Sequence, residues 1–362
     1  MKILYCYPYG ILGGVATVLS QRFEALAQLN IMCDYACLKP QGLTQAHFPA
    51  STRYIDSFSV RQLAQMAPEY DALVLIDWPE GLSCALETQK PVFYECHGSK
   101  PDMFKGLQHY AVQLSQVRAV IVPSDVSAAL WRAALPAFNS ERVYVVPNGL
   151  NLNVFCSNDV FEAKAKAVMP SAETGPWLLW VGKLNASKNW EAFLVLVQQL
   201  RARGIMAQGL IIGGASANTE AQAALTQAIY ERGLCQAVKW LSSVPYALLP
   251  RFYRLAAASG GLHVITSQHE SFAMTAVESL ASACPVVATP VGILPTLAEQ
   301  YPQFVQVASV LDDALLAAVL RQIETPKASA EQVLQMQASL RAAFSITTLA
   351  QAYAELIRRH CK

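Results

Sequence analysis

Short, continuously apolar segments alternate with helix-like segments along almost the whole chain. In the first half the apolar segments are 2–8, 72–78, 91–98, 119–124 and 143–149, with a weaker one at 52–56. In the second half they are 177–182, 208–214, 237–243, 262–267, 285–290 and 304–307. Strands that are apolar on both faces and alternate with helices predict parallel sheets covered by helices on both sides. The alternation therefore predicts an α/β protein with doubly wound sheets.

Length and a change of composition predict two such domains. A chain of 362 residues is too long for one ordinary hydrophobic core. Residues 151–176 are polar and mixed, as in a linker. We expect one doubly wound domain over 1–160, a linker over 161–176 and a second domain over 177–340. The last segment, 341–362, is expected to be a helix that crosses back to the first domain.

Composition argues against several classes of protein. The net charge of +1 gives no reason to expect a nucleic-acid partner, and no uncharged apolar run is long enough to span a bilayer. Nine cysteines without a Cys-x-x-Cys pair are expected to be buried, reduced thiols in a cytoplasmic protein. The apolar start could pass for a short signal peptide, but Pro8 and Gly13-Gly14 interrupt it. A first strand, a glycine loop and a helix explain it better.

Ligands of doubly wound sheets bind beyond the carboxyl ends of the strands. In the first half, Gly13-Gly14, Asp77, His97 and Ser124 fall at or close to such ends. A strand, two glycines and a helix can direct backbone N–H groups at an anion. The full Gly-x-Gly-x-x-Gly pattern is absent, so the sequence does not predict a dinucleotide fingerprint.

The second half carries a denser set of charged residues around two loops. Glu270 lies in the loop after one predicted strand, and Glu278 lies about one turn into the following helix. Lys183 and Lys188 flank the loop after the first strand of this half. Two ammonium groups and a helix N-terminus together suit a diphosphate, because charge-assisted contacts are strong and the helix dipole favours negative charge. No Asp-x-Asp occurs in the sequence, so a metal that bridges the diphosphate is not expected.

Four motifs follow one another in a set order. They are VVPNG at 145–149, VGKLNASK at 181–188, ESFAMTAVE at 270–278 and CPVVATPVG at 284–292. The set resembles the GT-B glycosyltransferases and, within them, the retaining family 4 with its Glu-x7-Glu signature. The resemblance implies two Rossmann-like domains whose parallel sheets face a central cleft, with the acceptor on the first domain and a nucleotide-sugar donor on the second.

The resemblance also implies a role for each matched residue. Glu278 would bind the ribose hydroxyls and Glu270 the hydroxyls of the donor sugar, while Lys183 and Lys188 would hold the diphosphate. His97 would lie beside the donor sugar near the reacting carbon. The catalytic set is thus His97, Glu270 and Lys188. The residues expected to bind the donor and its nucleotide are Gly14, Lys183, Lys188, Ser271, Phe272, Ala273, Met274 and Glu278.

Several positions depart from the family pattern, three of them at the expected site. Lys183 stands where the family more often has arginine, and the two are not interchangeable. Ser271 and Ala273 stand where it commonly has glycine. Both side chains narrow the space near the sugar and phosphates, so the identity of the donor does not carry over from the family.

The predicted function is metal-independent, retaining transfer of a hexose-type sugar from a nucleoside-diphosphate sugar, with a UDP- or GDP-sugar expected. The acceptor is a saccharide, a lipid-linked molecule or a small molecule, in the synthesis of cell-envelope polysaccharide or glycoconjugates. Lys100 and Lys105 give only a weak case for peripheral contact with the inner face of a membrane.

Two alternatives stay open. One is another GT-B enzyme, such as a sugar-nucleotide epimerase, which would need acid/base carboxylates from the first domain. Only Asp77 and Glu95 lie near strand ends there. The other is a transferase-like subunit that has lost activity. The four charged residues Lys183, Lys188, Glu270 and Glu278 argue against this second alternative, because none of them is needed for folding.

Overall fold

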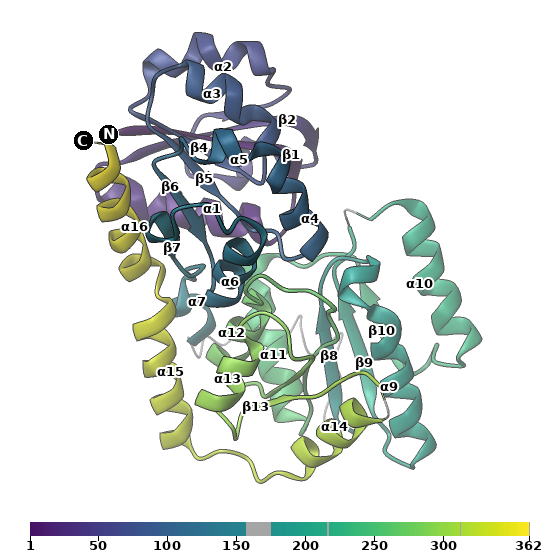
Figure 1. Ribbon diagram of the computed structural model, residues 1–362. Helices are drawn as coiled ribbons and strands as arrows, with labels where there is room; N and C mark the ends of the chain where they lie inside the picture. The colour runs from purple at the N-terminus through teal and green to yellow at the C-terminus, as the bar shows by residue number, and fades with distance from the viewer. Residues whose placement is uncertain (157–174, 216, 312, 362) are drawn as a thin grey trace. The chain divides into compact units, whose positions relative to one another are not determined.

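The computed structural model describes residues 1–156, 175–215, 217–311 and 313–361. The chain forms two compact α/β units, one from Met1–Asn151 with Phe344–Lys362 and the other from Leu152–Ala343 (Figure 1). Each unit contains a parallel sheet, which confirms the prediction of two Rossmann-like α/β domains. Most of the predicted linker, residues 161–174, lies outside the described residues.

The sheet of the first unit has seven strands among the described residues, in the order β3-β2-β1-β4-β5-β6-β7, and all neighbouring strands are parallel. The strands are β1 (Lys2–Ile11), β2 (Met32–Gln41), β3 (Tyr54–Ile55), β4 (Ala72–Ile76), β5 (Val92–Glu95), β6 (Ala119–Val122) and β7 (Val143–Val145). The helices are α1 (Gly14–Gln28), α2 (Val60–Met66), α3 (Leu82–Glu87), α4 (Pro101–Gly106), α5 (Ala111–Leu114), α6 (Asp125–Ala134) and α16 (Ile346–Cys361).

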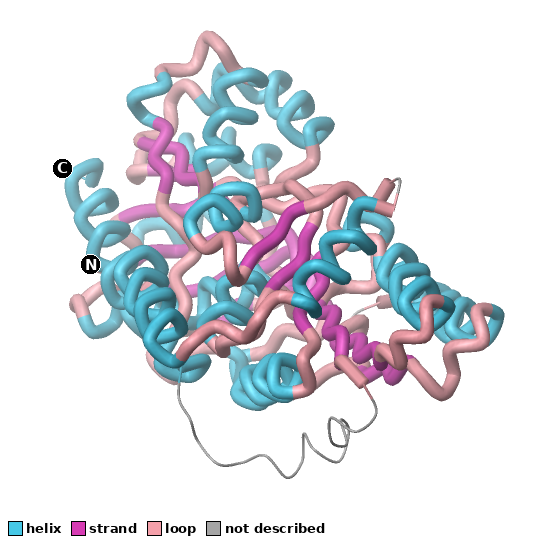
Figure 2. Tube along the Cα trace, turned by 90° about the horizontal axis from the view of Figure 1, so that it is seen from below, coloured by secondary structure: helices cyan, strands magenta, loops and turns pink. Residues whose placement is uncertain are grey.

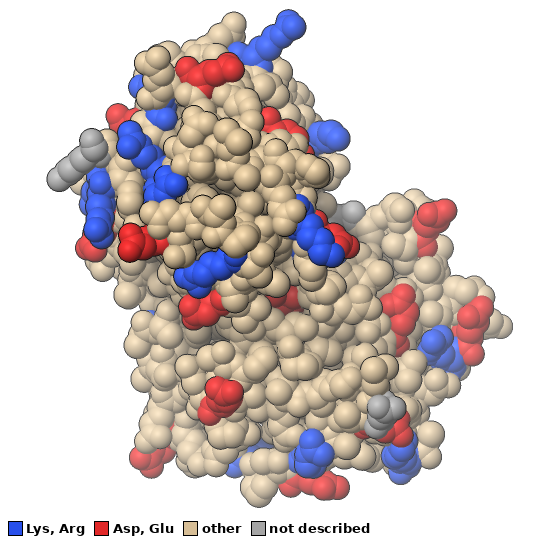
Figure 3. Space-filling view, viewed as in Figure 1, with Lys and Arg blue, Asp and Glu red and all other residues tan. Residues whose placement is uncertain are grey.

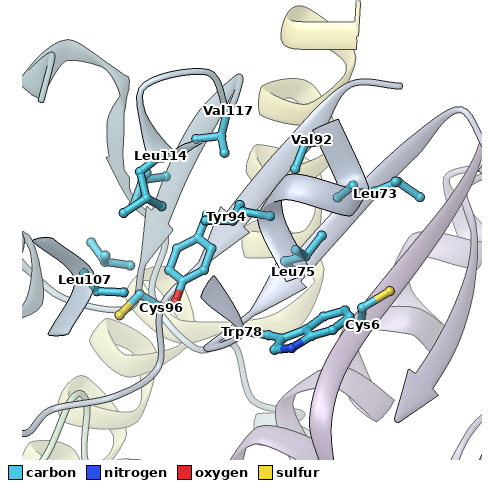
Figure 4. Close-up of a cluster of buried hydrophobic side chains, with 14 of the residues drawn as sticks. Cys6, Leu73, Leu75, Trp78, Val92, Tyr94, Cys96, Leu107, Leu114 and Val117 are labelled. Atoms are coloured by element: carbon cyan, nitrogen blue, oxygen red, sulfur yellow. The ribbon is translucent and has the colours of Figure 1, made fainter. Parts of the chain in front are cut away.

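Two hydrophobic layers cover the two faces of this sheet. Successive residues of a strand point to opposite faces, so Leu73 of β4 enters one layer and Val74 enters the other. The layer around Leu73 also holds Trp78, whose ring lies among the core side chains in Figure 4 and is 4% exposed. The other layer joins α1 to α16, the helix that ends the chain.

Strand β2 is one element of the first unit that the sequence did not reveal. Its sequence, MCDYACLKPQ, contains two charged residues and ends in Lys-Pro-Gln, so it does not read as an apolar run. Asp34 is nevertheless buried, because the Tyr70 hydroxyl donates to its Oδ2 at 2.8 Å and the Lys2 ammonium lies 3.1 Å from the same oxygen. Partners that lie far away in the sequence thus make this strand possible.

The second unit has a six-stranded parallel sheet within its described residues, in the order β10-β9-β8-β11-β12-β13. The strands are β8 (Trp177–Val181), β9 (Gln208–Ile212), β10 (Val238–Leu241), β11 (Leu262–Ile265), β12 (Val286–Ala288) and β13 (Val305–Val307). The helices are α7 (Leu152–Cys156), α9 (Trp190–Ala202), α10 (Thr219–Glu231), α11 (Leu249–Ala258), α12 (Met274–Ala281), α13 (Leu294–Gln300), α14 (Ala314–Glu324) and α15 (Ala330–Phe344). Figure 2 shows the strands enclosed by helices.

The strand order of the second unit reverses between β8 and β11. From β8 the sheet continues to β9 and β10 on one side, and to β11, β12 and β13 on the other. The carboxyl ends at such a switch point are where doubly wound sheets bind ligands. The loops after β8 and β11 therefore mark the expected position of a site.

The helical end of the chain consists of two helices, α15 and α16, and the second of them lies within the predicted segment 341–362. This helical end breaks at Ser345, where Leu150 intervenes: its N–H donates to the Phe344 carbonyl at 2.9 Å and its carbonyl accepts from the Ile346 N–H at 3.0 Å. The break lies where the chain passes from the second unit to the first. None of the described helices is long and apolar enough to cross a membrane.

Candidate functional site

The loops that follow β8 and β11 are joined by hydrogen bonds. The Thr266 hydroxyl lies 3.0 Å from the Lys188 carbonyl and 2.7 Å from the Asn189 carbonyl, and it accepts from the Trp180 indole N–H at 3.0 Å. The Gln268 N–H donates to the Ser187 carbonyl at 2.8 Å. Because both loops are tied to each other and to β8, the charged side chains that they carry are held in a defined place.

Three of the predicted site residues meet at these loops. The Lys188 ammonium lies 2.5 Å from Glu270 Oε1, and the Ser267 hydroxyl donates to the same oxygen at 2.8 Å. The Lys188 and Glu270 side chains are 28% and 11% exposed. Lys183 is half-buried, and its pKa is lowered, chiefly by burial and then by the ammonium of Lys188. Two cations and one carboxylate give this switch point a net positive charge.

Two glycines shape these loops. Gly213 has φ +125°, and a Cβ there would overlap the carbonyl oxygen of Gly182, next to Lys183. Gly292 has φ +57°, and a Cβ there would lie 2.9 Å from the Cβ of Glu270. Side chains at either position would displace the loop that carries a charged site residue. Gly292 belongs to a motif seen in the sequence, whereas nothing in the sequence distinguished Gly213 from an ordinary strand end.

Helix α12 begins at Met274, four residues after Glu270. Ala273 precedes its first residue with φ 82° and ψ 59°, in the left-handed region. Phe272 and Ala273 are buried, whereas Ser271 and Met274 are partly exposed. The predicted donor-binding residues 271–274 thus form the turn that leads into the helix, with no acidic side chain in the first turn to oppose an anion.

Replacing Ala273 by glycine is expected to raise the free energy of unfolding by about 1 kcal/mol, because a Cβ in the left-handed region costs roughly 1–2 kcal/mol. Ala276, in the interior of the same helix, gives a matched control. A276G is expected to lower the free energy of unfolding by about 1 kcal/mol. Chemical denaturation of the two variants measures both effects. A loss of stability in A273G would show that packing of the Ala273 methyl group outweighs the strain.

Glu278 is buried on α12 and bonded to two tyrosines. The Tyr246 hydroxyl donates to its Oε1 at 3.0 Å and the Tyr253 hydroxyl to its Oε2 at 3.3 Å. Burial raises the pKa of Glu278 to about 7, although both hydrogen bonds act in the opposite direction. The sequence did not identify the two tyrosines. Their spacing gave no clear signal, because Tyr246 lies in a short 3-10 helix and Tyr253 lies in α11, which follows it.

Gly14 and His97 lie in the first unit. Gly14 is the first residue of α1. The backbone N–H of His97 donates to Asp77 Oδ1 at 2.9 Å, and its ring Nε2 lies 2.7 Å from Glu95 Oε1. Asp77, with φ 44°, also accepts from the Gly98 N–H at 3.2 Å, so its carboxylate supports the turn.

Two other polar residues near strand ends or the signature, Ser124 and His263, take part in the fold itself. Ser124 caps α6 by accepting from the Ser127 N–H at 3.2 Å. His263 is fully buried in β11, and its two ring nitrogens lack partners within the described part of the chain. Burial lowers the pKa of His263 to about 3.

Over the described ranges no three His, Cys, Asp or Glu side chains gather as a metal site would require. On the face in Figure 3, charged side chains of both signs are scattered between uncharged ones.

Comparison with known sequences identifies a relationship in the second half of the chain. Residues 161–337 match the family model described as glycosyl transferases group 1. D-inositol 3-phosphate glycosyltransferase of Thermobispora bispora is 31% identical over 192 residues, which cover 51% of this chain and 43% of that protein. The enzyme of the same name from Nocardia farcinica is 31% identical over 179 residues, which cover 49% and 38%. The match thus spans less than half the length of these relatives.

Comparison with solved structures covers almost the whole chain. Anabaena HepE in complex with UDP-glucose superposes with a TM-score of 0.82 and 19% identity, covering 99% of this chain and all of that one. Sucrose-phosphate synthase from Thermosynechococcus elongatus superposes with a TM-score of 0.78 and 18% identity, covering 99% and 98%. At these identities the likeness establishes the fold, which is that of GT-B glycosyltransferase structures.

Proposed function

We propose that this chain is a glycosyltransferase that transfers a hexose-type sugar from a nucleoside-diphosphate sugar, with retention and without a metal ion. The observation that carries the proposal is the meeting of Lys183, Lys188 and Glu270 at the switch point of the second sheet. The match of residues 161–337 to glycosyl transferases group 1 supports it from the sequence side.

The two lysines would act on the leaving diphosphate. When the bond between the sugar and the diphosphate breaks, negative charge develops on the phosphate oxygens, and groups already aimed at that charge lower the barrier. Lys183 and Lys188 supply two cations, and the start of α12 adds a helix dipole. Together they would do the work that a bridging metal ion does in other transferases.

Glu270 would exchange one partner for another when the donor binds. Its Oε1 contacts both the Lys188 ammonium and the Ser267 hydroxyl. A diphosphate that draws Lys188 away would leave Glu270 free to accept hydrogen bonds from sugar hydroxyls, and a carboxylate can accept two at once. This pairing keeps both charges compensated before the substrate arrives.

The expected donor is a UDP-sugar and the acceptor remains a broad class. Anabaena HepE was crystallised with UDP, with UDP-glucose and with UDP and glucose, which makes UDP-glucose the first donor to test. The name of the Thermobispora relative includes an inositol phosphate, which makes a small phosphorylated polyol one acceptor to test beside a saccharide. The cell-envelope role and the cytoplasmic location rest on the sequence alone.

A thermal-shift panel of UDP-, GDP-, ADP- and dTDP-sugars tests this function. A ligand at 100 times its dissociation constant stabilises the native state by about 2.7 kcal/mol, so the true donor is expected to raise the melting temperature by several degrees. The K188A variant should lose most of the shift. If none of the four sugar nucleotides shifts the melting temperature, the proposal fails. A shift without turnover would favour the inactive subunit instead.

The epimerase alternative receives no support from the first unit. It would need Asp77 and Glu95 as acid/base groups. Asp77 accepts hydrogen bonds from two backbone N–H groups, and Glu95 forms a buried ion pair with Arg22 at 2.6 Å. Both carboxylates are therefore already engaged by the protein.

A further inference from the structure

The carboxylate of Glu95 links three elements of the first unit. Glu95 is the last residue of β5 and is 1% exposed. Arg22 of α1 contacts its Oε1 at 2.6 Å, the His97 ring contacts the same oxygen at 2.7 Å, and the Tyr353 hydroxyl of α16 donates to its Oε2 at 3.0 Å. The Arg22 guanidinium also lies 4.4 Å from the centre of the Tyr353 ring.

The charge of Glu95 determines which nitrogen of His97 carries a proton. Burial alone raises the pKa of Glu95, but the Arg22 guanidinium and the hydrogen bond from His97 outweigh it and lower the pKa to about 2. An ionised carboxylate can only accept hydrogen bonds. His97 Nε2 must therefore be the donor, and in a neutral ring this leaves Nδ1 as an acceptor.

The other ring nitrogen of His97 is not used by the protein. Within the described residues Nδ1 makes no hydrogen bond, and it is not fully buried. Asp77 binds only the backbone N–H of His97, while Arg22 and Tyr353 bind Glu95. His97 follows β5 at the carboxyl edge of the sheet, where ligands of doubly wound sheets bind.

We infer that Glu95 is a positioning residue, which Arg22 and Tyr353 hold in place, and which fixes His97 so that Nδ1 accepts a hydrogen bond from a hydroxyl of the substrate. The nature of that substrate rests on the proposed function, whereas the state of the ring does not. Arg22 and Tyr353 also couple this ring to α1, which begins at Gly14, and to the last helix of the chain.

The state of the ring is measured directly in the wild-type protein. Long-range ¹H–¹⁵N spectra of protein labelled on histidine nitrogen distinguish the two tautomers, and the H97Q variant identifies the signals of His97. We expect the proton of the neutral ring on Nε2, with Nδ1 unprotonated. Protonation on Nδ1, or rapid averaging between the two nitrogens, would overturn the inference without any reference to activity.

A double-mutant cycle then separates positioning from simple structural support. With UDP-glucose as the probe, E95Q is expected to lower turnover about ten- to hundredfold, the range found for carboxylates that orient functional histidines at metal sites. If Glu95 acts through His97, E95Q adds no further loss in the H97A background. An equal loss in both backgrounds would overturn the inference.

The Y353F variant and the turnover of the wild-type protein give two further checks on the role of Glu95. E95Q leaves the Arg22 charge without its partner, so Y353F is made in parallel. It removes one hydrogen bond from Glu95 Oε2 and keeps the ion pair, and it should give a smaller loss with the same dependence on His97. If the wild-type protein turns over no sugar nucleotide, the proposed function fails, and the nitrogen spectra still decide the state of His97.

Discussion

Replacing Lys188 by alanine is expected to lower sugar-nucleotide turnover by about 100- to 1,000-fold, the loss that follows removal of one group that stabilises developing charge. The Lys188 ammonium pairs with Glu270 and lies close enough to Lys183 to lower the pKa of Lys183. Its loss removes a cation from the diphosphate site and leaves Glu270 without its ion pair. Steady-state turnover of UDP-glucose measures the effect.

The fold is expected to survive this substitution, because partly exposed ion pairs contribute only about 0–1 kcal/mol to stability. Lys327, an exposed lysine of the same unit that donates to a backbone carbonyl, provides the control, and K327A should keep full turnover. E270A should lose turnover as K188A does. Similar turnover in K188A, E270A and K327A would remove Lys188 and Glu270 from the site.

The sequence predicted the charged residues of the candidate site in the second unit because each of them lies close to the end of a strand. Lys183, Lys188 and Glu270 lie within a few residues of β8 or β11, and adjacent parallel strands bring their carboxyl ends to one edge. Local order in the sequence thus determines which side chains meet. The same reasoning predicted neither the Lys188–Glu270 ion pair nor the tie between the loops through Thr266, because both depend on side-chain directions.

Contacts between distant segments explain what the sequence could not reveal. Tyr253 of α11 and Tyr246, in the short 3-10 helix before α11, reach Glu278 only through packing against α12. Glu95 likewise meets Tyr353 across 258 positions of sequence. Strand β2 was missed for the same reason, since the partners that neutralise Asp34 lie on other segments. Buried polar groups are thus the part of this fold that the pattern of apolar residues does not predict.

Ala273, where the family commonly has glycine, adds backbone strain but leaves the backbone conformation before α12 unchanged. The backbone there keeps φ 82°, a conformation that glycine adopts freely and alanine does not. Helix α12 therefore begins at Met274, as it would if residue 273 were glycine. Glu278 keeps its position within the helix. If the phosphates bind at the start of α12 as proposed, the methyl group would narrow the space for them and so bear on which donor fits.

Protonation of Glu278 should also change folding stability. A folded-state pKa of about 7 lies above the value near 4.3 of an unfolded glutamate, so the folded protein holds this proton more tightly. The stabilising effect is fully present below about pH 4 and is lost as the pH rises through about 7. Chemical denaturation at several pH values should show that E278Q lacks this dependence.

Binding of UDP-glucose is expected to weaken as the pH falls below about 7, by up to tenfold for each pH unit. Burial raises the pKa of Glu278 to about 7, so the free protein binds a proton at this carboxyl near neutral pH. The proposed ribose hydroxyls donate hydrogen bonds to the ionised form, which lowers the pKa in the complex. Donor binding therefore releases the proton, and acid opposes binding.

The design of the measurement separates Glu278 from other titrating groups. UDP-glucose is preferred to UDP, because its diphosphate is esterified at both ends and does not titrate between about pH 5.5 and pH 8. Lys183, whose pKa is lowered, would act in the opposite direction, since its loss of charge weakens binding as the pH rises. Calorimetric titration of the wild type and E278Q should give a sloping and a flat profile on the acid side. A flat profile for both would mean that the buried carboxylate of Glu278 does not contact the nucleotide, and Tyr246 and Tyr253 would then hold it for the fold alone.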